Sequence, residues 1–494
     1  MGIIQRQSIK YSVVNYAGAL IGMVNVLFIA PLALDEYGLI QILVATATLS
    51  LPFASLGSHT LPVRFFPKFR NQENGHSGFL GFLLLASSLA FIVFVFAVFL
   101  FWSPIFQFFT QRNEDNNYLP RFLAYFIPLA FFILQINILS AYISNFHRIV
   151  WPTVVNELFL KVAVPFLTLL FIWHFLSVQW LVLLVLGAYG LIVAMLLAYL
   201  LYLGELNLKI DWPRIRKLIP EMIRYAFFSS LGSIGSLLAF QIDVIMLGGL
   251  AGLKNTGIFS LNNYITNTVD IPQRAIQKIT APIIAKAIEE QNMAEIQSTY
   301  IKTSLNLSLA GFGLLILIWF NLDNLLDILP SGETLRAGKY VILILGIGKI
   351  SDLITGVNGH IIFYSKYYRT GFYLILVLGG LNILFNSYFI PRYGVNGAAI
   401  ATALSLTSYN VLKTLYVYFR FRIHPFTSKT GILLLISGFV IGLAYLYPST
   451  GNDWLDLIFR SIILGGAFAG LIFYFRISED LNNALVGFIK KIRP

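Results

Sequence analysis

Fourteen apolar stretches, each long enough to cross a lipid bilayer, follow one another through most of this chain. A helix needs about 20 apolar residues to span the hydrocarbon core. Lipid offers no hydrogen-bond partner for an exposed backbone amide or carbonyl, so a spanning segment must satisfy its backbone internally, as a helix does. Fourteen spans use more than half of the 494 residues. The stretches therefore predict an all-α polytopic membrane protein with little room for an extramembrane domain.

The composition agrees with this fold class and excludes an ordinary water-soluble domain. Hydrophobic residues make up 57% of the chain and charged residues only 11%. The absence of cysteine excludes disulfides, thiolate catalysis and cysteine-ligated metals. The predicted spans are residues 9–33, 38–61, 79–103, 119–145, 152–176, 178–203, 221–250, 256–286, 303–321, 335–362, 370–391, 394–419, 430–447 and 455–475.

Positive charge alternates between successive loops. With a cytoplasmic N-terminus, the inside segments hold 22 Lys and Arg residues and the outside loops hold 6. Cationic loops resist translocation, so this bias predicts an even number of spans and two cytoplasmic termini. The first apolar run is too long for a cleavable signal peptide and is expected to remain as the first span. The net charge of +12 therefore reflects membrane topology and does not indicate a nucleic-acid partner.

The long polar connection 204–220 separates six predicted spans from eight. It is rich in Lys and Arg and is typical of a cytoplasmic linker between two lobes. The predicted organisation is a six-helix lobe at 1–203, a second six-helix lobe at 221–422, and two further helices with a basic tail at 423–494. A faint similarity between the beginnings of spans one and seven fits either a repeated lobe or the shared composition of apolar helices. Two similar lobes that rock about a midplane site are a common transporter plan.

Two sequence motifs resemble a known family. Residues 391–399 read Pro-Arg-Tyr-Gly-Val-Asn-Gly-Ala-Ala, similar to a Pro-x-Tyr-Gly-x-x-Gly-Ala-Ala turn between spans eleven and twelve. Residues 241–248 carry an aspartate in span seven, and Thr256-Gly257-Ile258-Phe259-Ser260 is similar to a Gly-x-Tyr-Ser start of span eight, with Phe259 in place of tyrosine. Together with the span count, these motifs resemble the polysaccharide transporter branch of the multidrug/oligosaccharidyl-lipid/polysaccharide exporter superfamily, which includes O-antigen flippases.

This resemblance implies a V-shaped pair of six-helix lobes around a central cavity. It implies alternating-access transport of an undecaprenyl-diphosphate-linked oligosaccharide across the bacterial inner membrane, for the biosynthesis of surface polysaccharides such as lipopolysaccharide O-antigen. The implied partners are the lipid-linked oligosaccharide, membrane lipids, and a polysaccharide polymerase and glycosyltransferases. We expect no cofactor, and coupling to Na⁺ or H⁺ is one of two interpretations of an intramembrane aspartate described below.

The leading candidate site is in span eight, where Asp270, Arg274 and Lys278 recur every four residues and so share one helix face near Pro272. Charges inside a span cost about 2.5 to 3.5 kcal/mol at the bilayer centre and need a reason to be there. An Arg fork and a mobile ammonium suit a diphosphate. The alternative is that Asp270 neutralises Arg274 as a structural pair while Lys278 reaches toward the headgroups.

Span ten contributes Lys349 and Asp352, three residues apart. They either pair with each other, which is the favoured interpretation, or let Lys349 add a second contact to an anionic ligand. Arg64, at the cytoplasmic end of span two, is a candidate guard of the cavity mouth. Asp243 stands among apolar neighbours in span seven. It either binds Na⁺ or a proton as part of ion coupling, or pairs with a cation from span eight.

Other intramembrane charges have structural explanations. Glu157 and Lys161 are spaced to pair along one helix. Lys413 and Arg460 are each within reach of an interface and are expected to extend toward it. The six histidines lack metal-ligand spacing, and we find no phosphate-binding loop with its magnesium ligand.

Two other functions fit a chain of this kind. A drug or cation antiporter of the same fold would prefer acidic residues in an apolar cavity, whereas cations predominate here. A membrane polysaccharide polymerase or ligase would need a substantial outside loop, and the longest, around 104–117 and 322–334, are short. The sequence therefore favours a flippase that is not an enzyme, with the antiporter as the alternative.

Overall fold

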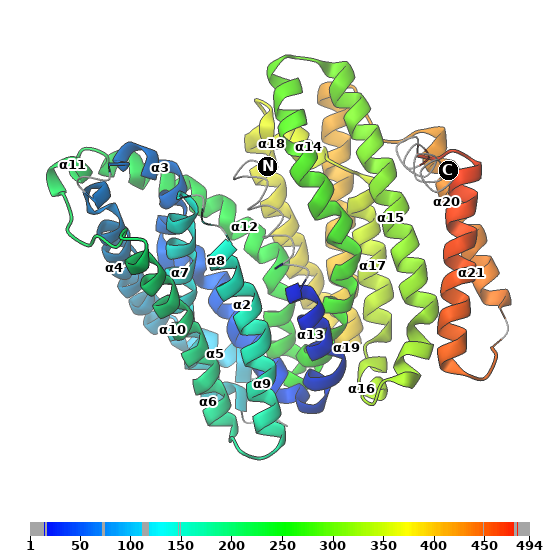
Figure 1. Ribbon diagram of the computed structural model, residues 1–494, viewed down its shortest axis with the longest axis horizontal. Coiled ribbons are helices and arrows are strands. Elements are labelled where there is room, and N and C mark those ends of the chain that lie inside the picture. Colours follow the sequence, from blue (N-terminus) through cyan, green and yellow to red (C-terminus); the bar gives the residue numbers. More distant parts are fainter. Residues whose placement is uncertain are drawn as a thin grey trace, which may run out of the picture. The chain divides into compact units, whose positions relative to one another are not determined.

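Most of the described part of the chain is helical. The computed structural model describes residues 14, 17–71, 75–110, 118–146, 148, 150–447, 449–478 and 482. Within these ranges it contains α-helices, short 3₁₀ and π turns, and no strand (Figure 1). The predicted all-α fold class is confirmed.

Nine helical segments of the described chain are long and apolar enough to cross a membrane, which makes the chain a multi-pass membrane protein. A tenth span forms if α17 (Lys339–Ile354) and α18 (Asn358–Tyr364) count as one helix bent by 52°. The nine segments are Ala17–Ser55, Gly75–Leu100, Leu119–Ser144, Val150–Ile172, Val178–Tyr202, Met293–Ile328, Tyr368–Phe421, Ser428–Leu446 and Asp453–Tyr474.

The difference from fourteen predicted spans arises partly because two segments each contain two of them. In Ala17–Ser55, a π turn at Asn25–Ile29 and a 3₁₀ turn at Ala30–Ala33 precede α2 (Leu34–Ser55). In α19 (Tyr368–Phe421), the break falls at Gly394, with φ 53° and ψ −125°. The chain reverses there, because Thr370 and Tyr416, near the two ends of the segment, are hydrogen-bonded at 3.1 Å. The turn predicted between spans eleven and twelve is therefore confirmed.

Predicted spans seven and eight differ from each other. The seventh corresponds to one long helix, α12 (Ile219–Ala251), whose described residues include the apolar stretch Gln241–Ala251. The eighth is split into α13 (Leu253–Thr266), a 3₁₀ turn at Asn267–Asp270, and α14 (Ile271–Glu289). Its two helices are interrupted and rich in amides and charges, as expected of the least apolar predicted span.

The chain divides into two compact units, Met1–Leu261 and Asn262–Pro494. In the first unit, α12 packs against α2, because glycines allow the two helices to approach closely. A Cβ at Gly57 would collide with the carbonyl of Ala226, and one at Gly248 would collide with Ile42. The compact units thus divide about one and a half helices beyond the predicted linker 204–220, and the two-lobe division there stays a prediction.

The other helices of the first unit are α3 (Leu61–Phe69), α4 (Phe79–Leu100), α5 (Trp102–Thr110), α6 (Tyr118–Phe122), α7 (Phe126–Ser144), α8 (Val150–Thr153), α9 (Leu160–Ile172), α10 (Val178–Tyr202) and α11 (Trp212–Arg216).

The second unit contains α14, α17, α18 and α19 together with α15 (Met293–Ile328), α16 (Gly332–Arg336), α20 (Ser428–Leu446) and α21 (Asp453–Tyr474). Leu305 and Ile316 of α15 form one apolar cluster with Leu433 of α20 and Phe468 of α21. The two C-terminal helices, predicted as an addition to the second lobe, therefore pack into the core of this unit.

Candidate functional site

The candidate site begins where span eight is interrupted. α13 ends at Thr266, a 3₁₀ turn covers Asn267–Asp270, and α14 starts at Ile271 with Pro272 in its first turn. Proline has no backbone N–H and suits the first turn of a helix, so Pro272 favours a new start rather than a continuous helix. The turn places the side chains of Asn267 and Asp270 against α17.

Lys349 of α17 is held by both side chains of this turn. Its Nζ donates to the carboxylate Oδ2 of Asp270 and, at 2.9 Å, to the amide Oδ1 of Asn267. The Lys349 and Asp270 side chains are only 12% and 21% exposed. Lys349 therefore pairs across helices with Asp270. The favoured prediction that it pairs with Asp352, one turn along its own helix, is wrong, as is the alternative that pairs Asp270 with Arg274.

Asp352 takes part in a second pair. Gln273 of α14 donates to its Oδ2 at 2.5 Å, and Lys413 Nζ of α19 lies 3.6 Å from its Oδ1. The Lys413 side chain is 8% exposed, with its ammonium 4.2 Å from the ring centre of Tyr409. The expectation that Lys413 extends to an interface is therefore wrong. This lysine is buried because a carboxylate and an aromatic face receive its charge.

Arg274 differs from these paired charges. Its side chain is exposed on α14, one turn beyond Asp270, and interacts with that carboxylate electrostatically without forming an ion pair within the described parts of the chain. Lys278 lies in α14, and its side chain is not among those that the structure describes.

The charges of this network do not balance. The described side chains comprise the cations Lys349, Lys413 and Arg274 and the carboxylates Asp270 and Asp352. Each carboxylate already has an ammonium partner, so one positive charge is left without a counter-ion. We call these five residues the charge network. An uncompensated guanidinium beside two satisfied ion pairs is suited to bind an anion.

Two predicted site residues lie in the first unit. Arg64 of α3 is exposed, with its guanidinium 4.8 Å from the ring centre of Tyr225 on α12. Asp243 of α12 is 5% exposed and has an interaction partner, so it is not the solitary carboxylate that its apolar neighbours indicated. Arg64 and Asp243 therefore belong to one compact unit and the charge network to the other.

The remaining predicted charges are structural. Lys161 and Glu157 form the predicted pair at 2.8 Å. Arg460 donates to the carbonyl of Phe320 at 3.1 Å and lies 5.2 Å from the ring centre of Tyr447. Among the described residues, no group of three or more His, Cys, Asp or Glu side chains is arranged to hold a metal ion.

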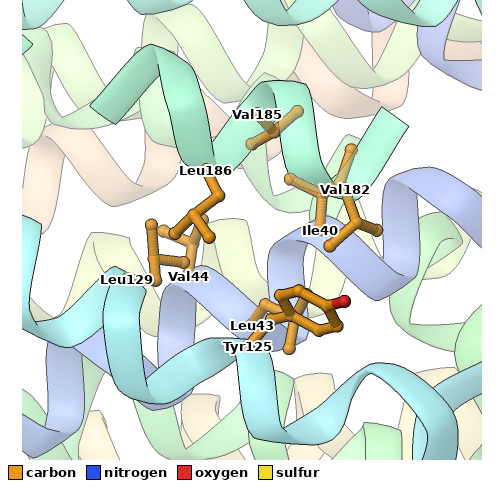
Figure 2. A pocket seen from close by; sticks show the side chains of 8 residues that line it. All are labelled: Ile40, Leu43, Val44, Tyr125, Leu129, Val182, Val185 and Leu186. Atoms are coloured by element: carbon orange, nitrogen blue, oxygen red, sulfur yellow. The ribbon is translucent and has the colours of Figure 1, made fainter. Parts of the chain in front are cut away.

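The first unit contains an apolar pocket between α2, α7 and α10 (Figure 2). Its lining offers one hydroxyl, from Tyr125, and no charge. Such a lining offers nothing that would bind an anionic headgroup, so the pocket does not compete with the charge network as a diphosphate site. The lining residues are Ile40, Leu43, Val44, Tyr125, Leu129, Val182, Val185 and Leu186.

Sequence reasoning missed three residues in or around the charge network. Asn267 and Gln273, which are hydrogen-bonded to members of the network, lie on span eight within one turn of Asp270. Lys413 lies near the end of predicted span twelve, where its position fits both burial and extension to an interface. Amides are common in helices of this kind and gave no charge signal.

The fold is shared with solved membrane transporters. The structure is similar to that of the lipid II flippase MurJ in its inward closed conformation, with a TM-score of 0.73 and 14% identity, over 95% of this chain and all of that one. It is also similar to an inward-facing multidrug resistance MATE family transporter of the MOP superfamily, with a TM-score of 0.61 and 14% identity, over 82% of this chain and 94% of that one. At these identities the likeness concerns the fold alone.

The sequence places the chain within a family. Residues 4–288, more than half of the chain, match the family described as polysaccharide biosynthesis protein, and the chain belongs to that family. A curated relative is the probable low-salt glycan biosynthesis flippase Agl15 of Haloferax volcanii, 23% identical over 285 residues, which is 56% of this chain and 58% of the relative. The chain spans about half the length of the curated relatives it matches.

Proposed function

We propose that this protein is a flippase that moves a polyprenyl (undecaprenyl) diphosphate-linked oligosaccharide across the bacterial inner membrane by alternating access, for surface polysaccharide biosynthesis such as that of O-antigen. Membership of the polysaccharide biosynthesis family and a relative described as a flippase support it. The observation that carries the proposal is the charge network, in which Arg274 is left without a counter-ion while both carboxylates are paired.

The roles of the side chains follow from their chemistry. Arg274 presents parallel N–H donors that match phosphate oxygens. Lys349 is paired with Asp270 and can contribute its ammonium when an anion competes with that carboxylate. Lys278 is proposed to add a further positive charge on the helix face of Arg274. Arg64, in the other unit, is proposed to meet the headgroup at the cavity mouth. In a site of low dielectric these contacts are stronger than in water, which offsets the dehydration of the diphosphate.

Ion coupling is proposed to use the carboxylates Asp243, Asp270 and Asp352, with Na⁺ or H⁺ as the coupling ion. Each carboxylate has a partner in the structure. A coupling ion must therefore displace that partner, which ties ion binding to a rearrangement of the ion pairs.

The likeness to a MATE transporter fold keeps a drug or cation antiporter as the second candidate. That function requires a carboxylate available to a cation. In the charge network both carboxylates already contact a lysine, which favours an anionic substrate. A polymerase or ligase is the less favoured alternative, because the predicted outside loops are short. Cytoplasmic termini, and a polymerase and glycosyltransferases as partners, complete the proposal.

The test compares Arg274→Ala with Arg274→Lys in cells that depend on this protein. The readout is the leaflet orientation of the polyprenyl-diphosphate-linked oligosaccharide, with protein abundance measured in parallel. We expect R274A to leave the lipid on the cytoplasmic face and R274K to restore part of the transport, because an ammonium keeps the charge and loses the fork. Lys286→Ala is the matched control, since Lys286 lies on the same helix, is 73% exposed, and is 3.6 Å from Glu290.

Wild-type orientation with R274A at normal abundance would remove Arg274 from the site. Normal orientation of the lipid in cells without the protein, together with greater sensitivity to cationic drugs, would favour the antiporter.

A further inference from the structure

We propose that the connection from Gly204 to Lys217 is a fixed platform that binds the anionic phospholipid headgroups of the leaflet it faces. The argument starts from how this segment is held. It makes up most of the predicted linker 204–220, and a linker of this length need not have a fixed position. In the structure, it is bonded along its length to the loop that precedes α4, and all of these contacts lie within the first unit.

Backbone and side-chain hydrogen bonds tie the platform to the loop. The amide of Asp211 donates to the carbonyl of Ser77 at 3.0 Å, and the side chain of Asn207 donates to the carbonyl of Gly75 at 3.1 Å. Arg214 donates to Ser77 Oγ at 3.1 Å and to the carbonyl of Lys68 at 3.2 Å. These contacts also place α11 beside the end of α3 (Figure 1).

A buried histidine fixes the start of the platform. The backbone N–H of Asn71 donates to His76 Nδ1 at 3.1 Å, so the ring proton is on Nε2, which lies 2.8 Å from the carboxylate of Glu205. His76 is 1% exposed and packs against the rings of Phe66 and Phe146, which also contact each other. Close packing of the backbones continues the attachment, because a Cβ at Gly78 would collide with the carbonyl of Lys209.

The carboxylates of this region already have hydrogen-bond partners within the first unit. Glu205 is bonded to His76, and Asp211 accepts from the backbone of Arg214 at the start of α11. Lys209, Arg216 and Lys217 are exposed and have no ion-pair partner within the described ranges. The platform therefore presents positive charge that no described carboxylate neutralises.

The platform also presents apolar surface beside these cations. Ile215 is fully buried and anchors α11, while Trp212 is 50% exposed and Leu208 is 55% exposed. The Trp212 ring contacts Phe82, in the first turn of the span formed by α4, with their centres 6.4 Å apart. Tryptophan at the end of a span is typical of the headgroup region. Cations beside an interfacial tryptophan match an anionic leaflet, which favours each such cation by about fivefold.

This inference does not depend on the transported substrate. It assigns the segment a role in attaching the first unit to an anionic leaflet. If a soluble protein bound the platform instead, Trp212 would lie away from the acyl chains, and brominated lipids would not quench its fluorescence.

The test uses the full protein in nanodiscs that contain phosphatidylcholine and phosphatidylglycerol at equal mole fractions, with bromine on the acyl chains of one lipid at a time. Bromine quenches tryptophan on contact, and the Trp212 signal is the difference between the protein and Trp212→Phe. We expect brominated phosphatidylglycerol to quench this signal about twofold more than brominated phosphatidylcholine. The preference should disappear in K209Q/R216Q/K217Q and weaken with salt.

The control is K302Q/K366Q/R369Q, which removes three exposed cations that the sequence predicts on the same side of the membrane. It should keep the preference. The six other tryptophans report folding, because their quenching by brominated phosphatidylcholine should be unchanged in both triple variants. Equal quenching by the two lipids, a preference that survives in the platform variant, or no quenching of Trp212 by either lipid would each overturn the proposal.

Discussion

At the scale of single residues, the charge network shows which contacts a sequence can predict. Glu157 and Lys161 are four residues apart on one helix, and the pair was predictable because helix geometry fixes their spacing. Lys349 and Asp270 are separated by 79 residues, and their contact depends on how α17 packs against the turn before α14. The sequence therefore identified Asp270 and Lys349 as intramembrane charges but not as partners.

Asp270 has a predictable effect on anion binding, because its carboxylate occupies the ammonium that a phosphate would need. Asp270→Asn should raise the affinity for inorganic pyrophosphate by up to about tenfold, measured by calorimetry on the purified protein. The same change should lower the apparent Tm without ligand, since it removes the counter-ion of a largely buried lysine. Transport should slow, because a headgroup held without competition is released less readily.

The matched control for this change is Asp323→Asn, which removes a carboxylate of the same unit that pairs with Lys339 at 2.7 Å outside the charge network. It should leave pyrophosphate binding unchanged. Unchanged affinity in D270N would show that Asp270 does not compete with the anion. Increased affinity in both variants would point to a general charge effect.

At the scale of helices, glycines decide where the chain turns and how closely helices pack. The Pro-x-Tyr-Gly motif and apolar length predicted separate spans before and after residue 393. Both spans lie in α19, and the chain reverses between them at Gly394, so that Thr370 and Tyr416 are in contact. Likewise, the division between the units follows the contact of Gly57 and Gly248 with neighbouring helices. Such close approaches depend on tertiary packing, which hydropathy does not report.

Alanine substitutions in α19 should separate these effects. Gly394→Ala should lower stability by about 1 to 3 kcal/mol through backbone strain alone, because a side chain there has a positive φ and meets nothing within 4 Å. Gly397→Ala should be at least as harmful for a different reason, since its Cβ would collide with the carbonyl of Phe389. Gly380→Ala, a helical position with open space, should be neutral or slightly stabilising.

Thermal unfolding in detergent and abundance in membranes measure all three. A neutral G394A would mean that the bend at residue 394 does not need a positive φ. A harmful G380A would mean that the series reports a loss of flexibility in α19 and not the two named causes.

At the scale of the whole molecule, the orientation in the membrane rests on the distribution of loop cations, and the absence of cysteine makes it directly measurable. A single cysteine introduced at an exposed position is the only thiol in the chain. Lys217→Cys lies in the predicted cytoplasmic linker, and Lys254→Cys lies in the predicted outside connection before span eight. Both positions are exposed within the first unit, so burial cannot account for a difference between them.

In intact cells with the outer membrane made permeable, a thiol reagent that cannot cross the inner membrane should label K254C and not K217C. After the inner membrane is opened, both should react. The reason is electrostatic, because segments rich in Lys and Arg are retained on the cytoplasmic side. Labelling of K217C alone in intact cells would show that the topology is the inverse of the predicted one. The platform with Lys209, Arg216 and Lys217 would then face the outer leaflet. Arg64 would face the periplasm and could not be the first residue to meet a lipid-linked substrate made in the cytoplasm.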